Sequence, residues 1–446
     1  MAQKYKYLHL VNYNTFLLWD IKRYFMTQMA SSHPIVKLGD YIQEEGTKYN
    51  ISDKTKTYGI LGVNNQTGIF DAYEENGSKI KQKYKKMQVG WIAYNPYRVN
   101  VGSIGIRTEE HLFEYISPAY VVFSCKKGLL PEFLFLLMKT DLFNKIIREN
   151  TTGSVRQNLN YSVLSNLQIP LPSLAEQNKI VAAYDATIAQ AKQYSTQAKD
   201  INDQIKYYLR DKLEIETIDH NTTEKQTDSF LYFINYSTID KWGTDFMIKN
   251  IQSSSSTKYK TKKICQLCNI SSGGTPNRGR KEYYGGNIPW IKTGELKNDI
   301  LTDTEEKITP LGMNNSSAKL YPKGSLVVAM YGATIGKTAK LGVDATTNQA
   351  CAVLFDIDNK QIQTDFLWLY LQSQTDKLKA MAYGGAQPNI NAGIVANYEI
   401  PLPPFDTQNE IVEHITRLRK KQKDLQQKSL YLRQQATQQF EQTIFN

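Results

Sequence analysis

A proline-containing segment that leads into a polar helix occurs twice in this chain, and it limits the possible folds more than any other feature. The two copies read IPLPSLAEQNKIV from residue 169 and IPLPPFDTQNEIV from residue 400, which is 231 residues later. Proline holds the residue before it in an extended conformation, so each copy predicts an extended segment followed by a helix. Ser173 and Glu176 have the spacing of a capping box, which marks a helix start. A repeat of this length is too long for a solenoid unit and predicts a duplicated domain.

Other segments recur at the same offset and extend the repeat over whole domains. The matched pairs are 119–124 with 350–355, 133–138 with 366–371, and 153–160 with 384–391. The first pair predicts a strand and the second an apolar helix in each copy. Further strands are predicted at 59–63 and 90–94, and similar aromatic-containing stretches at 12–25 and 235–246 place the start of the repeat earlier. The chain is therefore predicted to contain two copies of one mixed α/β (α+β) domain.

The two polar helices are predicted over residues 173–213 and from residue 406 to the C-terminus. Each has apolar or small residues at a spacing of three and four, as at Ile411, Ile415 and Leu418. About forty residues give a rod of roughly 60 Å, too polar to be buried all round, so we expect the two helices to pack on each other. The predicted order is an N-terminal segment 1–33, domain 34–172, helix 173–214, domain 215–403 with a linker at 215–229, and helix 404–446.

Composition and charge limit the class of protein. The 446 residues are 41% hydrophobic, which is typical of a globular protein. The 54 basic and 43 acidic residues give a formal charge of +11, which is compatible with a polyanionic partner and is also tolerated by other soluble proteins. Because there is neither an apolar stretch long enough for a membrane span nor a signal-peptide pattern at the N-terminus, we expect a cytoplasmic protein without a membrane partner. Four cysteines in a chain of this length do not predict a disulfide framework.

Three motifs suggest enzymatic or metal chemistry, but each is incomplete. The segment 332–338 resembles a phosphate-binding loop, yet it has three residues between its glycines where four are needed. Asn95-Pro96-Tyr97 resembles the Asn-Pro-Pro-Tyr loop of amino-methyltransferases but lacks one proline. Cys265 and Cys268 have zinc-ligand spacing without a second pair. We therefore expect a non-catalytic chain without a metal site.

Two variable α/β domains, each followed by a near-identical junction and a long helix, resemble the specificity subunit of a type I restriction-modification system. The resemblance covers nearly the whole chain. Besides the junctions it rests on the segments 102–105, 332–337, 273–276 and 288–291. An alternative in the same broad class is the specificity subunit or domain of a type II restriction-modification enzyme, and an alternative in another class is a structural scaffold that does not bind DNA.

The resemblance implies that each globular domain is a target-recognition domain that reads one half of a split DNA sequence. It also implies that the two helices pack as an antiparallel coiled coil and set the spacer between the half-sites. The expected partners are double-stranded DNA, two methyltransferase (modification) subunits, and restriction/translocase subunits. This chain is expected to bind no cofactor, because S-adenosylmethionine, ATP and Mg²⁺ would be used by the partner subunits.

Candidate DNA contacts divide into phosphate-binding and base-reading side chains. The phosphate-binding candidates are Lys79, Lys81, Lys83, Lys85, Lys86, Arg278, Arg280 and Lys281. The base-reading candidates are Arg98, Asn100, Arg107, Arg156, Thr275, Lys292, Tyr331, Lys337 and Gln387. The lysine run could equally be the solvated edge of a strand, where lysine discourages aggregation. Asn158 and Asn389 recur at equivalent positions, so we expect them to cap local structure.

Overall fold

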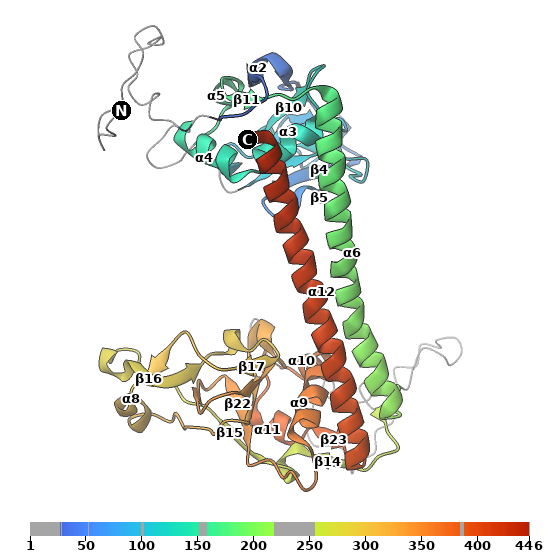
Figure 1. The fold of residues 1–446 in the computed structure, drawn as a ribbon. Coiled ribbons are helices and arrows are strands. Elements are labelled where there is room, and N and C mark those ends of the chain that lie inside the picture. Colours follow the sequence, from blue (N-terminus) through green and yellow to red (C-terminus); the bar gives the residue numbers. More distant parts are fainter. Residues whose placement is uncertain are drawn as a thin grey trace, which may run out of the picture. The chain divides into compact units, whose positions relative to one another are not determined.

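The computed structural model describes residues 27, 29–51, 53–99, 102–150, 158–217, 255–383 and 388–445. The stretches 12–25 and 235–246, most of the predicted N-terminal segment 1–33, and most of the predicted linker 215–229 lie outside the described residues. The chain forms two compact units, residues 1–195 with 427–446 and residues 196–426. Each unit contains one globular domain and one part of each long helix (Figure 1).

The first domain is built on two sheets. A four-stranded antiparallel sheet has the order β2 (Ile42–Glu44), β10 (Val121–Cys125), β7 (Ile92–Tyr94), β8 (Ile104–Ile106). A five-stranded sheet has the order β3 (Lys48–Tyr49), β6 (Tyr84–Lys86), β9 (Tyr115–Ile116), β4 (Thr57–Asn64), β5 (Gly68–Asn76). The helices are α2 (Leu38–Tyr41), α3 (Pro131–Met138), α4 (Asp141–Asn150) and α5 (Tyr161–Ser165). The core joins the apolar faces of α3 and α4 to the four-stranded sheet, with Phe133, Phe143 and Phe123 fully buried.

The second domain repeats the first of these sheets. Its five-stranded sheet has the order β15 (Asn269–Ser272), β22 (Cys351–Phe355), β19 (Leu326–Ala329), β20 (Thr338–Leu341), β17 (Asp299–Leu301). Its first four strands are antiparallel, like the sheet β2-β10-β7-β8. A smaller sheet joins β18 (Lys307–Ile308), β16 (Tyr284–Ile291) and β21 (Thr346–Thr347). The helices are α8 (Pro310–Asn314), α9 (Thr364–Ser373), α10 (Thr375–Ala380) and α11 (Ala392–Ala396), and short 3-10 turns are η4 (Ile264–Gln266), η5 (Lys281–Tyr283), η6 (Thr293–Glu295) and η7 (Gly332–Thr334).

The proline motif of each copy forms a strand that closes its own domain. In the first domain β11 (Gln168–Pro170) pairs with β1 (Ile35–Lys37), and in the second β23 (Glu399–Pro401) pairs with β14 (Thr261–Lys263), both antiparallel. Proline lacks an amide hydrogen, and here it ends a two-stranded ladder where one fewer donor is tolerated. The predicted extended segment before each helix is therefore confirmed.

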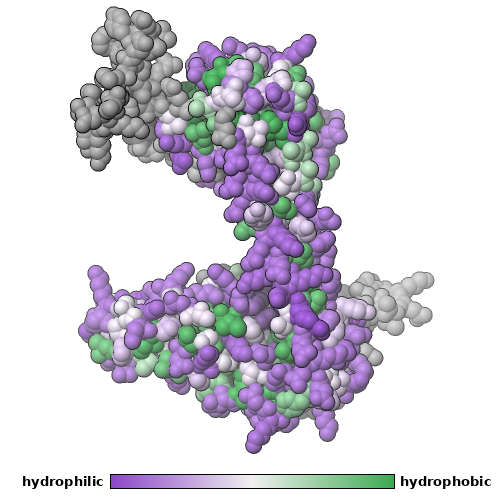
Figure 2. Space-filling view, in the orientation of Figure 1, coloured by the Kyte–Doolittle hydropathy of each residue, from purple (hydrophilic) through white to green (hydrophobic). Residues whose placement is uncertain are grey.

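The two long helices are α6 (Leu174–Lys212) and α12 (Phe405–Phe445), with 39 and 41 residues. Ser429 Oγ donates to the Ala191 carbonyl at 2.7 Å, and Gln422 Nε2 donates to the Ala198 carbonyl at 2.8 Å. Residue numbers rise along one helix while they fall along the other, so the pair is antiparallel. The outward surface of the helices is largely hydrophilic (Figure 2), as the sequence predicts for a pair that buries only one stripe of each helix. The predicted mixed α/β fold with two antiparallel helices is confirmed.

The C-terminal part of α6 also packs on the N-terminal part of α12 within the second unit. The Tyr208 ring stacks on His414 with 4.0 Å between centroids, and Lys212 Nζ lies 2.6 Å from Glu410 Oε1. The hydrogen bond from Lys212 holds the pKa of the Glu410 carboxyl below its usual value. Ser255 and Ser256, predicted to be flexible, instead form β13 (Ser255–Ser256), which pairs with β12 (Glu216–Thr217) directly after α6. Backbone pairing thus overrides the turn tendency of serine at this place.

Candidate nucleic-acid interface

A fully buried glutamine holds each junction to its domain. Gln177 Oε1 accepts from the Leu130 amide at 2.8 Å, while Nε2 donates to the Gly128 and Pro172 carbonyls at 3.0 and 2.9 Å. Leu130 is the N-cap residue of α3, so its amide has no partner inside that helix. The glutamine therefore ties the first turn of α6 to the loop before α3 and to the proline segment.

The second junction repeats this arrangement with Gln408. Its Oε1 accepts from the amide of Gln363, the N-cap residue of α9, at 2.7 Å, and its Nε2 donates to the Pro403 carbonyl at 2.9 Å. Both glutamines are fully buried. The Gln-Asn dipeptides that follow the two proline motifs therefore have a structural reason, since the glutamine fixes where each helix leaves its domain.

In the first domain, the loop after β7 carries the most accessible candidate. Asn95 Oδ1 accepts from the Tyr97 amide at 3.0 Å, and the Arg98 amide donates to the Asn95 carbonyl at 3.0 Å. These bonds form a rigid turn that presents Arg98 to solvent. The Arg98 guanidinium forms no hydrogen bond or ion pair with any residue that the structure describes.

Arg107 has a different role. Its Nε donates to the Phe113 carbonyl at 3.0 Å, one terminal nitrogen donates to the Met87 carbonyl at 2.9 Å, and the other lies 3.4 Å from the His111 carbonyl. The planar guanidinium is thereby used to join three backbone segments of the domain. We therefore remove Arg107 from the candidate base-reading residues.

The lysine run of the first domain divides in the same way. Lys85 is only 5% exposed, its Nζ donates to the Tyr120 carbonyl at 2.8 Å, and burial lowers its pKa. A phosphate cannot reach this ammonium, so Lys85 also leaves the candidate set. Lys86 pairs with Glu114 at 2.8 Å and lies over the Tyr115 ring, and Lys79 lies 4.0 Å from Glu75. Lys81 and Lys83 are exposed and have no ion pair within the described residues.

In the second domain, Arg278 is held by its own domain. Its two terminal nitrogens donate to Glu306 at 2.7 and 2.9 Å, and its guanidinium lies between the rings of Tyr284 and Trp290 at 4.7 and 4.8 Å. Lys292 lies 3.4 Å from Glu305 and 3.6 Å from Glu306, so it adds to the same charge network. Arg278 and Lys292 are therefore mainly neutralised within the domain.

The remaining candidates of the second domain are more accessible. Arg280 is close to Glu282 at 3.3 Å but has 63% of its side chain exposed, and Lys281 is exposed. Lys337 is half-buried in the loop between η7 and β20, and its ammonium has no printed partner among the described residues. Thr275 Oγ1 bonds to Gln349 within the domain. Tyr331 is 48% exposed.

Three of the base-reading candidates, Asn100, Arg156 and Gln387, lie outside the described residues. The predicted capping role of Asn158 and Asn389 is wrong by two positions. The N-cap residues are Asn160, which accepts from the Val163 amide at 2.9 Å, and Asn391, which accepts from the Ile394 amide at 2.9 Å. Asn160 and Asn391 begin the short helices α5 and α11, which the repeated Asn-x-Asn pattern did not distinguish.

Comparison with known proteins places this architecture in a family. The model of the type I restriction modification DNA specificity domain matches residues 35–206 and 256–431. The chain belongs to this family. The two matches correspond to the two copies of the repeat, each extending into the helix that follows its domain.

Relatives and solved structures agree with this family. The specificity subunit of the type I restriction enzyme HindI of Haemophilus influenzae is 24% identical over 363 residues, which cover 72% of this chain and 78% of that protein. The EcoR124I/EcoR124II specificity subunit of Escherichia coli is 29% identical over 147 residues, 32% of this chain and 36% of that one. A solved chain from a study of complex assembly and conformational transition of a type I system has a TM-score of 0.58 at 16% identity, covering 94% of this chain and 97% of its own, and it shows the shared fold. As a type I specificity subunit, the chain is a non-catalytic subunit.

The motifs that suggest other chemistry have structural roles in this type I specificity subunit. The loop around Gly332 and Gly336 joins β19 to the strand β20, whereas a phosphate-binding loop leads from a strand into a helix. Cys268 is buried with its Sγ directed at the Ile264 carbonyl, and burial raises its pKa to about 12. Among the described residues, no group of three or more His, Cys, Asp or Glu could hold a metal ion, and no helix is long and apolar enough to cross a membrane.

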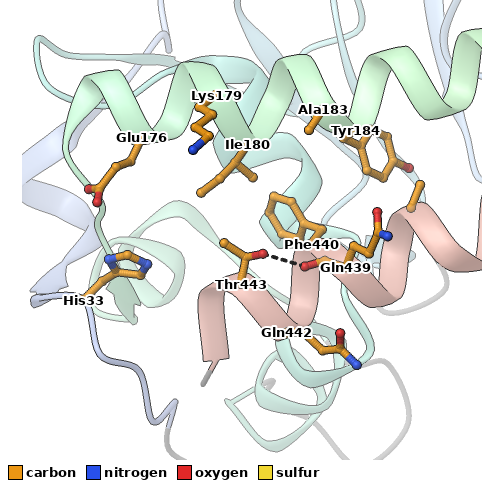
Figure 3. Close-up of a pocket in the computed structure, with 11 residues that line it drawn as sticks. His33, Glu176, Lys179, Ile180, Ala183, Tyr184, Gln439, Phe440, Gln442 and Thr443 are labelled. Atoms are coloured by element: carbon orange, nitrogen blue, oxygen red, sulfur yellow. Dashed lines mark hydrogen bonds between the residues drawn. The ribbon is translucent and has the colours of Figure 1, made fainter.

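A cavity of about 560 Å³ lies between the first turns of α6 and the last turns of α12 in the first unit (Figure 3). Its lining includes His33, Lys179, Tyr184 and Phe440, and Figure 3 shows their side chains converging from both helices. Glu176 also lines it but accepts hydrogen bonds from the Ser173 amide and hydroxyl at 2.9 and 2.8 Å, in the predicted capping box. The candidate DNA-contact residues do not line this cavity, which belongs to the joint between helix and domain.

Proposed function

We propose that this chain is the DNA sequence-recognition subunit of a type I restriction-modification complex. Each globular domain, 34–172 and 215–403, would act as a target-recognition domain that binds one half of a bipartite double-stranded target. The observation that supports this best is the repeat itself. The two domains share a sheet order and a glutamine-held junction, but they differ in the exposed residues of the loops after β7 and β19.

The partners follow from the family. The chain would direct two methyltransferase subunits, which use S-adenosylmethionine, and restriction/translocase subunits, which use ATP and Mg²⁺, to the DNA sequence that it has bound. It would work in the cytoplasm, where the DNA is. The free cations Lys81, Lys83, Arg98, Lys281 and Lys337 are our candidates for DNA contact, because their charges are not neutralised within the described residues.

Selection from a randomised duplex library tests this function directly. The full chain, purified with the modification subunits of its own system, would be incubated with the library, and bound duplexes would be sequenced. We expect a motif of two short specific halves separated by a spacer of fixed length without base preference. A single continuous motif, or no enrichment over the input library, would contradict the proposal.

A further inference from the structure

A tyrosine occupies the same structural position in both domains. Tyr97 follows β7 and Tyr331 follows β19, the equivalent strands of the two sheets. The carbonyl just before each tyrosine accepts an equivalent hydrogen bond, from the Leu159 amide to Pro96 at 3.0 Å and from the Ile390 amide to Met330 at 2.9 Å. These donors are fully buried and directly precede the N-cap residues of α5 and α11.

The constant offset of the repeat does not reveal this equivalence. An offset of 231 residues places Asn100, and not Tyr97, opposite Tyr331. The reason is the length of the loop that follows, because Gly105 comes eight residues after Tyr97 whereas Gly336 comes five residues after Tyr331. Only the hydrogen bonds of the two sheets identify the matching residues.

Both tyrosines are held rigidly by their backbones while their rings are exposed. Tyr97 is 56% and Tyr331 is 48% exposed. The Tyr97 amide donates to Asn95 Oδ1 at 3.0 Å, and Tyr331 forms an antiparallel bridge with Asn389 and accepts from Thr334 Oγ1 at 2.8 Å. Neither phenol hydroxyl has a hydrogen bond to a residue within the described ranges. A large aromatic side chain on a fixed turn, with its polar end open, suits contact with a partner.

The residues around these tyrosines differ between the domains. Arg98 follows Tyr97, whereas Gly332 follows Tyr331, and Lys337 follows Gly336 where Ile106 follows Gly105. If the domains read different half-sites, the side chains that differ are suited to read bases. A side chain that recurs is suited to bind what both half-sites share, which is the sugar-phosphate backbone.

We propose that Tyr97 and Tyr331 are equivalent backbone-contact residues, each of which donates its hydroxyl to a phosphate of its own half-site. This inference rests on the proposed function. It reassigns Tyr331 from base reading to positioning, and it adds Tyr97, which the sequence did not single out as a contact. Tyrosine hydroxyls are among the side-chain donors that position proteins on DNA phosphates without reading sequence.

The test uses Tyr97→Phe and Tyr331→Phe in the full chain with its modification subunits. Each change removes one exposed hydroxyl and keeps the ring, so the thermal unfolding midpoint should stay at the wild-type value. We expect each variant to bind the selected duplex about three- to tenfold more weakly, as for loss of one hydrogen bond to a charged group. The base preference in both half-sites should be unchanged. Tyr207→Phe on α6, where the side chain is 74% exposed, is the matched control and should bind like wild type.

Neutral methylphosphonate substitution identifies the phosphate. Replacing phosphates one at a time should reveal one position in each half-site where wild type loses the same affinity and the Phe variant of that domain loses nothing further. If wild type selects a bipartite motif but the Phe variants bind equally well, or shift the base preference of a half-site, this inference is overturned and the proposed function stands. If wild type enriches no motif, both fail.

Discussion

Arg98 and Lys337 lie on loops of different domains whose backbones are held by hydrogen bonds, and neither charge is neutralised within the described residues. Each should therefore affect only the half-site bound by its own domain. We predict that Arg98→Ala alters recognition of one half-site and Lys337→Ala that of the other, because a base contact contributes about 1–3 kcal/mol of discrimination. Methylation across a randomised-sequence library measures this, and equal loss of discrimination at both half-sites would reject the assignment.

Gln177 is the residue on which the first junction depends most. Its amide group satisfies three backbone groups in a fully buried site, so Gln177→Ala leaves them without partners. We predict a loss of about 2–4 kcal/mol in the free energy of unfolding of the first unit. Hydrogen exchange at the Leu130 amide reports the site directly. Asn178→Ala is the control, because its exposed side chain bonds only to its own helix, and an equal effect of the two changes would refute the role of Gln177.

At the scale of elements, α12 is continuous from the second junction to its contacts with Tyr184 and Phe133 in the first unit. An insertion of four residues after Ala191 is expected from the sequence to lengthen the DNA spacer. The structure shows why α6 alone is insufficient, since Ser429 and Gln422 of α12 bond to the backbone of α6 on both sides of that point.

We therefore predict that four residues inserted after Ala191 together with four after Gln426 lengthen the preferred spacer by one or two base pairs, because each insertion adds about 6 Å. The insertion in α6 alone should mainly lower the thermal unfolding midpoint. Selection from a library of duplexes with varied spacers measures the first effect. An unchanged spacer in the double insertion, with the fold intact, would rule out the helices as the ruler.

At the scale of the whole molecule, the formal charge of +11 becomes informative only once the internal ion pairs are known. If six to ten phosphates are contacted, affinity for the selected duplex should fall about 10³- to 10⁵-fold between 50 and 200 mM salt. A titration of binding against salt concentration measures this slope. A scaffold that does not bind DNA would show no such binding at low salt, and the Lys81→Ala, Lys83→Ala double variant should reduce the slope by about two contacts.

Much of the fold follows from the sequence alone. The repeated proline motif, the apolar segments at 133–138 and 366–371, and the two polar helices predict a duplicated mixed α/β domain with a helix after each copy, and α3, α9, α6 and α12 lie where these patterns place them. These features are local, because proline geometry, helix capping and apolar periodicity act within a few residues of one another.

The site depends on contacts that only the tertiary structure decides. Lys83 and Lys85 look alike in the sequence, yet one is exposed and the other is buried against the Tyr120 carbonyl, 35 residues away. Tyr97 and Tyr331 become equivalent only through hydrogen bonds to Leu159 and Ile390, each about sixty residues further along the chain. Which charges are free and which positions match are therefore properties of packing, since a side chain's partners come mostly from segments distant in sequence.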